Sequence, residues 1–256
     1  MIDINKAKVE FLRYTEKFDL ENENIKRKQL HSLRVIEISG KIVESINLSN
    51  EEKDLAILIG LLHDIGRFEQ FTQYGTFRDR ESIDHGDFGV EILQKDNYIK
   101  KYIDNEEDIN IIYKAIKNHN KYQIEKGLNK KQELFCNIIR DADKIDILYE
   151  ATEIFYTPEQ IKEINNSILT EEISSKIYSK KTINRNEFRK KGKLIDVFVI
   201  LAFLFDINYK KSFEIIYEEN YINKIFQRFN FKDEETRIKT KEVQEFLNKY
   251  IKEKIT

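Results

Sequence analysis

The sequence predicts an all-α fold, and two observations lead to this prediction. The chain of 256 residues contains one proline and eight glycines, so few residues break a helix or form a tight turn. All-β and α/β folds need many such turns between short β-branched runs. Apolar residues instead return at helical spacing along most of the chain. The 40% of hydrophobic residues are enough for one large domain, or for a domain with a helical extension.

The first predicted helices are amphipathic, with apolar residues that return at helical spacing. Residues 3–20 and 25–46 form two amphipathic stretches, and a third helix begins near Glu51 and continues through the apolar run LAILIGLL. Residues 68–86 mix aromatic side chains, arginines and glycines. We expect this segment to be an irregular loop with a functional role.

The remainder of the chain is also predicted to be helical. Helices are expected at residues 85–95, 106–119, 132–156, 158–179, 209–230 and 236–253. The polar, basic segment 180–193 precedes an apolar stretch at 194–205, which is too short for a membrane span and is predicted to be a buried helix.

Composition excludes several classes of protein. A single cysteine, Cys136, excludes an internal disulfide and a thiolate metal cluster, and it indicates a reducing compartment. The 44 basic and 46 acidic residues nearly balance, so no overall charge directs the chain to nucleic acid or to an anionic membrane. With no secretory signal in the N-terminal residues, we expect a cytoplasmic protein with no membrane or nucleic-acid partner. An anionic substrate would have to be held locally.

All four histidines fall at predicted inward positions: His31, His63, His85 and His119. His31 and His119 share the apolar stripes of their helices, and His85 opens a helix. His63 and Asp64 directly follow the apolar run, where a buried charge is costly unless it is paired or binds a metal. A lone histidine on an apolar face is usually a hydrogen-bonded core residue, but four together with an aspartate favour a metal site. Imidazole and carboxylate ligands suit Zn, Fe, Mn or Co, and the lack of thiolates argues against structural zinc.

The segment RDADKID, residues 140–146, is expected to add a further carboxylate. On a helical wheel Asp143 and Asp146 lie inside the apolar arc, whereas Asp141 lies at its edge. The polar side is marked by Asn137, Arg140 and Lys144. We therefore favour Asp143 as an inward ligand. The alternative, an exposed charged face, suits Asp141.

The order His31, His63-Asp64, Asp143 resembles the H…HD…D signature of the HD superfamily of metal-dependent phosphohydrolases. The resemblance covers about residues 25–150 and includes the local motifs HSLRV, LLHDIGRFEQ and IRDADKID. It implies an all-α HD-domain helical bundle whose ligands come from separate helices. It also implies that His31, His63, Asp64 and Asp143 bind a divalent metal ion.

His85 and His119 extend the resemblance to the two-metal branch, with the pattern H…HD…H…H…D. In that branch Asp64 would bridge two ions drawn from Fe, Mn, Zn, Co or Ni, and the two additional histidines would bind the second ion. A single-metal alternative leaves His85 and His119 to contact substrate or to act as acid and base.

The resemblance also implies a mechanism, in which a metal-bound hydroxide attacks a phosphoryl group. Asp64 and Arg67 would be the catalytic residues. Asp64 would hold the metal, and Arg67 corresponds to a position that is often lysine in the two-metal branch and faces the substrate phosphate there. The alternative is a surface arginine at a helix end. Lys144 and Arg78 are weaker candidates for binding phosphate. Phe71, Tyr74 and Phe77 could stack on a base, but aromatic residues in loops more often pack the loop against the protein.

The predicted function is therefore hydrolysis of a phosphomonoester or phosphodiester, in a nucleotide or a nucleotide-derived signal. One alternative is a mixed-valent diiron oxygenase resembling myo-inositol oxygenase or the organophosphonate oxygenases, which share this ligand pattern. Another is a metal-stabilised binding module. The sequence lacks a GYP motif, so a cyclic-di-GMP phosphodiesterase is not supported.

We expect residues 1–156 to form the metal-binding catalytic domain and residues 157–256 a helical extension. This extension would cover the catalytic bundle or provide a homodimer contact.

Overall fold

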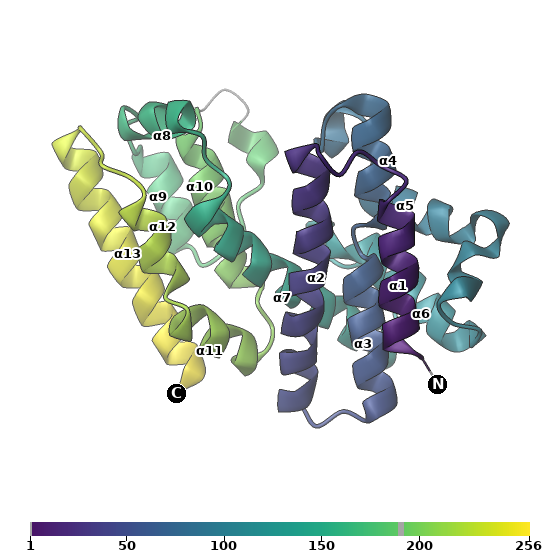
Figure 1. The fold of residues 1–256 in the computed structure, drawn as a ribbon. Helices are drawn as coiled ribbons and strands as arrows, with labels where there is room; N and C mark the ends of the chain where they lie inside the picture. Colours follow the sequence, from purple (N-terminus) through teal and green to yellow (C-terminus); the bar gives the residue numbers. More distant parts are fainter. Residues whose placement is uncertain (1, 189–191) are drawn as a thin grey trace. The chain divides into compact units, whose positions relative to one another are not determined.

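The computed structural model describes residues 2–188 and 192–256, and every regular element in this part of the chain is a helix (Figure 1). The predicted all-α class is confirmed. Residues 189–191, within the basic segment predicted at 180–193, lie outside the described residues. None of the helices described combines the length and apolar character needed to cross a bilayer.

The chain divides into two compact units, Met1–Asp143 and Lys144–Thr256. The helices that begin in the first unit are α1 (Ile4–Thr15), α2 (Glu23–Ser45), α3 (Asn50–Leu62), α4 (Ile65–Tyr74), η1 (Asp79–Glu81), α5 (His85–Gln94), η2 (Lys95–Lys101), α6 (Glu106–His119) and α7 (Lys130–Glu153). The division falls inside α7. The domain boundary expected after residue 156 stays a prediction.

In the first unit, α3 is the central helix. It packs against α1, α2 and α6, and Figure 1 shows α1, α2 and α3 side by side. Its apolar run is buried except at Ile57, which is partly exposed: Leu55, Leu58, Leu61 and Leu62 are at most 2% exposed. A capping box between Ser49 and Glu52 begins the helix, because each side chain accepts a hydrogen bond from the other residue's backbone N–H. His63 and Asp64, which follow the C-terminus of α3, are also buried.

The second unit consists of α8 (Pro158–Asn165), α9 (Glu171–Tyr178), η3 (Arg185–Phe188), α10 (Leu194–Leu201), η4 (Ala202–Asp206), α11 (Lys210–Glu218), α12 (Tyr221–Gln227) and α13 (Glu234–Ile255). The long helix α13 packs against α9, α11 and α12 (Figure 1). Its inner face buries Val243, Leu247 and Ile251.

Three predicted elements differ from the structure. The segment 68–86 is not irregular throughout, because α4 continues to Tyr74 with Phe68 and Gln70 buried, and ends where Gly75 adopts a left-handed φ of 66°. The helix predicted at 158–179 is two helices, α8 and α9. The helix predicted at 209–230 is divided into α11 and α12 at Asn220, whose φ is 57°.

Gly66, in the first turn of α4, allows a close approach of α4 to α5. A Cβ at this position would lie 2.5 Å from the carbonyl oxygen of His85 and 2.8 Å from the backbone nitrogen of Gly89. Both contacts are with backbone atoms, which move only if the helices separate. Gly66 lies two residues after Asp64, and its close contact is with the backbone of His85. The absence of a side chain at Gly66 therefore sets the distance between the His63-Asp64 pair and His85.

We predict that Gly66→Ala destabilises the protein by about 1–3 kcal/mol, because a methyl group is forced into a closely packed contact. Gly40→Ala, in the interior of α2, is the matched control. Its Cβ would meet no atom nearer than 4.0 Å, so this variant should gain about 0.5–1 kcal/mol from helix propensity. Chemical denaturation measures both effects. Equal changes in the two variants would contradict the close approach.

Candidate metal centre

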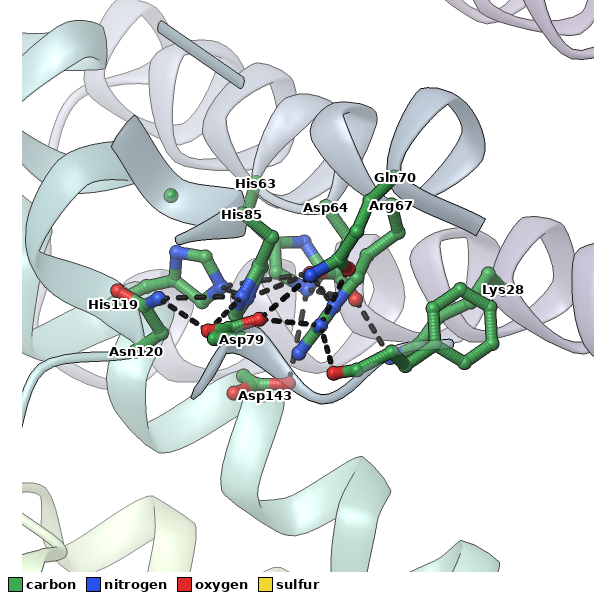
Figure 2. A network of polar contacts seen from close by, with 12 residues as sticks. Lys28, His63, Asp64, Arg67, Gln70, Asp79, His85, His119, Asn120 and Asp143 are labelled. Atoms are coloured by element: carbon green, nitrogen blue, oxygen red, sulfur yellow. Dashed lines mark hydrogen bonds and ion pairs between the residues drawn. The ribbon is translucent and has the colours of Figure 1, made fainter. Parts of the chain in front are cut away.

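The six predicted metal ligands lie together in the first unit, although they come from five places along the chain: His31 in α2, His63 and Asp64 between α3 and α4, His85 at the start of α5, His119 at the end of α6 and Asp143 in α7. The side chains of His63, Asp64, His85 and His119 point toward one another in Figure 2. Each histidine is at most 3% exposed. The helical positions inferred from sequence therefore place these residues in one cluster.

Four atoms form the first half of the cluster. Nε2 of His31 lies 3.1 Å from Nε2 of His63 and 3.1 Å from Oδ1 of Asp143. Oδ2 of Asp64 lies 3.5 Å and 3.6 Å from the two histidine nitrogens. Nε2 of His63 lies 3.7 Å from Oδ1 of Asp143. Two imidazoles and two carboxylates thus converge on one point.

Three atoms form the second half. Nε2 of His85 lies 2.9 Å from Nε2 of His119, and Oδ1 of Asp64 lies 3.3 Å and 3.5 Å from them. Asp64 therefore directs one oxygen into each half. It occupies the N-cap position of α4, yet its side chain makes no capping hydrogen bond, so both oxygens serve the cluster.

The hydrogen bonds of the ring nitrogens fit metal binding. Nδ1 of His63 and Nδ1 of His119 donate to the carbonyl oxygens of Gly60 and Ile116, at 2.7 Å and 2.6 Å. Nδ1 of His85 donates to the Asp79 carboxylate at 2.6 Å. In a neutral ring the proton on Nδ1 leaves a lone pair on Nε2. Lone pairs that converge on carboxylate oxygens call for a cation between them.

The spacing of the donor atoms is also that of a coordination shell. Neighbouring atoms bound at ~2.0–2.2 Å to a tetrahedral or octahedral ion lie roughly 2.8–3.6 Å apart. The contacts in both halves, from 2.9 to 3.7 Å, are close to this range. The residues present therefore fit two divalent ions that share Asp64.

The protonation states also suit metal ligands. Burial opposes the ionisation of Asp64, but the positive charge of Lys28 and the neighbouring His63 hold the pKa of this carboxyl well below its usual value. Burial likewise opposes the ionisation of Asp143, and its contacts with the rings of His31 and His63 lower its pKa in spite of this. Burial and the charge of Arg67 lower the pKa of His85 to about 3. Neutral imidazoles and ionised carboxylates are the forms that bind metal.

Asp79 connects the second half of the cluster to the segment after α4. Its Oδ2 accepts the His85 hydrogen bond, and its Oδ1 accepts hydrogen bonds from Arg67 Nη1 at 2.8 Å and Gln70 Nε2 at 3.0 Å (Figure 2). Asn120 also donates to Oδ2, at 3.2 Å. A carboxylate that accepts the second N–H of a metal-binding histidine fixes the orientation of the ring and raises its basicity. Sequence reasoning missed Asp79, because a loop residue has no periodic position.

Arg67, the predicted phosphate ligand, lies beside the cluster with its side chain 14% exposed. Its Nη1 also donates to the carbonyl oxygen of Phe77 at 2.6 Å and to Gln70 at 2.8 Å. Its Nε is buried without a hydrogen-bond partner, 3.6 Å from Oδ1 of Asp64. Arg67 is therefore a buried cation held against the cluster, and its contact with substrate stays a prediction.

The other predicted phosphate-binding residues are held by ion pairs. Arg78 is exposed and pairs with Glu81 at 3.2 Å. Lys144, in the second unit, is buried and pairs with Asp206 at 2.9 Å. The roles of Arg78 and Lys144 in binding phosphate stay predictions. Phe77 packs against Phe71 with ring centroids 4.8 Å apart, so these two aromatic residues hold the segment together.

The polar side predicted for α7 is buried at three of its positions. Asp141, the candidate for an exposed face, is 0% exposed, and Arg140 and Lys144 are 3% and 6% exposed. Arg140 donates to the carbonyl oxygens of Asn118 and Lys121, at 2.9 Å and 2.6 Å, at the C-terminus of α6. A cation is favourable there because these carbonyl groups lack partners within the helix. The alternative of an exposed face is therefore wrong for Asp141, because this polar side of α7 is packed. Arg140 secures the helix end that carries His119.

We predict that metal stoichiometry separates the two halves. Asp64→Ala should bind no divalent ion after dialysis, since both halves lose a ligand, whereas His119→Ala should keep one ion per chain. Elemental analysis of the purified variants gives the counts, and circular dichroism verifies that they are folded. Retention of an ion by Asp64→Ala together with loss of both by His119→Ala would contradict the arrangement.

A second prediction concerns Asp79. Asp79→Asn should weaken binding of one of the two ions by roughly 10–100-fold, because the His85 ring loses its negatively charged acceptor. Asp87→Asn is the matched control, since Asp87 lies in α5 and pairs with Lys121, away from the ring of His85. Isothermal titration with Mn²⁺ resolves the two affinities. An unchanged affinity in Asp79→Asn would show that this carboxylate does not support the site.

Comparison with known proteins agrees with the geometry. Residues 30–148 match the family model described as HD domain. This range includes His63, Asp64, His85 and His119 and both outer ligands, His31 and Asp143. Comparisons with curated proteins and with solved structures gave no match.

Proposed function

We propose that this chain is a metal-dependent phosphohydrolase acting on a phosphomonoester or phosphodiester, because residues 30–148 match the family model described as HD domain. HD domains belong to a superfamily of metal-dependent hydrolases. The observation that supports the proposal most directly is that Asp64 directs its two oxygens to two separate pairs of histidines. Two-metal centres that share a carboxylate suit phosphoryl transfer, because two cations stabilise both the attacking and the leaving oxygen.

His31, His63, Asp64 and Asp143 would hold one ion, and Asp64, His85 and His119 the other. When bound, the ions would activate a water molecule and neutralise charge on the phosphoryl group. The protein itself provides orientation. Backbone carbonyl groups fix the rings of His63 and His119, and Asp79 fixes His85.

Arg67 would bind a substrate phosphate oxygen in this proposal. Its buried Nε has no hydrogen-bond partner and lies beside Asp64, so an oxygen placed there would gain a charged donor. A guanidinium group also presents several donors in a fixed plane, which suits phosphate.

The more specific features are proposed on sequence grounds. The substrate would be a nucleotide or a nucleotide-derived signal, with Arg78 and Lys144 as further candidates for binding its phosphates. We also propose a cytoplasmic location, consistent with the single buried cysteine, and a homodimer that forms through the second unit.

The proposal is tested with a panel of mono-, di- and cyclic nucleotides and sugar phosphates. Protein loaded with Mn²⁺, Co²⁺, Ni²⁺ or Zn²⁺ under strict anaerobiosis should release phosphate or a nucleoside monophosphate from at least one compound. Asp64→Ala should reduce this activity to background. Turnover that requires iron and oxygen would identify the oxygenase alternative. No turnover in the wild type, with a lower melting temperature in Asp64→Ala, would identify a binding module.

A further inference from the structure

We propose that Lys28 binds the phosphoryl group of the substrate and that its position selects phosphomonoesters. This inference rests on the proposed function and names the substrate class of the same site. Lys28 contacts Asp64 and belongs to a group of cations around Phe77.

Lys28 lies three residues before His31 in α2, about one helical turn away, so both side chains are on one face of the helix. The residue is only 9% exposed. Its Nζ donates to Oδ2 of Asp64 at 2.8 Å, the oxygen that faces His31 and His63. Figure 2 shows Lys28 and His119 at opposite ends of the polar network.

This pairing does not account for Lys28 once the centre holds metal. The carboxylates of Asp64 and Asp143 balance only part of the charge of two divalent ions. A buried ammonium group beside them is then repelled, unless an anion lies between the ammonium group and the ions. A substrate phosphoryl group is such an anion, and a charged donor makes its strongest hydrogen bonds to phosphate oxygens.

A second observation indicates an anion at the same place. Three cations surround the ring of Phe77: Arg67 Cζ is 5.6 Å from the ring centroid, Lys28 Nζ 5.8 Å and Arg27 Cζ 5.8 Å. Arg67 comes from α4 and the other two from α2. The ring allows cations from two helices to lie close together, because its face attracts positive charge. The result is positive charge concentrated on one side of the metal ligands.

The number of phosphate oxygens determines the substrate class. A phosphodiester has two non-bridging oxygens and one negative charge, and a two-metal clamp uses both oxygens. A phosphomonoester has three terminal oxygens and a charge of about −1.5 to −2 at neutral pH. Its third oxygen remains for Lys28. The ammonium group therefore favours a terminal phosphate over an internal one.

The test measures binding of two probes, inorganic phosphate and dimethyl phosphate, to metal-loaded protein by calorimetry at pH 8. Wild-type protein should bind phosphate at least tenfold more tightly than dimethyl phosphate. Lys28→Met should lose about tenfold or more of the phosphate affinity and leave dimethyl phosphate binding unchanged. Lys28→Arg should retain most of the phosphate affinity, because it keeps the charge. Lys26→Met, at an exposed position in α2, should behave as wild type.

Metal affinity separates this role from a structural one. If Lys28 only supports the fold of the site, Lys28→Met should lose metal affinity and phosphate affinity together. We expect metal affinity that is unchanged or higher, since a competing cation leaves Asp64. Phosphate binding that is unaffected by Lys28→Met, lost in parallel with metal binding, or absent from the wild type would overturn the inference. Binding requires no turnover, so a protein that binds phosphate through Lys28 but cleaves no ester would refute only the proposed function.

Discussion

The carboxylate of Asp64 is the group on which the first unit depends. Its two oxygens face two different pairs of histidines, and these pairs come from helices that are distant in the sequence. An ionised carboxylate buried at the end of an apolar helix is costly unless cations or hydrogen-bond donors surround it. Lys28 and Arg67 provide positive charge in the polypeptide itself, and divalent ions would provide more. The break between α3 and α4 places this side chain at the centre.

The surrounding structure keeps the donors in place. Gly66 allows α4 to approach α5 closely, Arg140 secures the end of α6, and Asp79 orients His85. Each of these residues acts on an element that carries a ligand. Orientation of this kind matters because a ring that rotates loses its contact with the metal, whereas a fixed ring offers a lone pair without further reorganisation. The packing of the helices therefore determines where the candidate ligands lie and how they are oriented.

Much of the fold and the burial of the candidate ligands could be predicted, because both depend on short-range patterns. Helical spacing placed His31 and His119 on buried stripes, and the end of an apolar run placed His63 and Asp64. Breaks in helices were harder to predict, since a residue with a left-handed backbone, such as Asn220, has no strong sequence signal. Asp79 was missed because loop residues lack a period. The spacing of Lys28 to His31 places both residues on one face of the helix. The role of Lys28 was nevertheless not predicted, because a lysine in an amphipathic helix is usually on the solvent face.

The central proposal is that Asp64 would join two divalent ions into one centre. Electron paramagnetic resonance of the wild-type protein loaded with Mn²⁺ tests it most directly, because ions sharing a carboxylate at about 3.5–4 Å are magnetically coupled. We predict two Mn²⁺ ions per chain and the spectrum of a coupled pair. A single ion per chain, or two ions with the spectrum of isolated Mn²⁺, would contradict the claim.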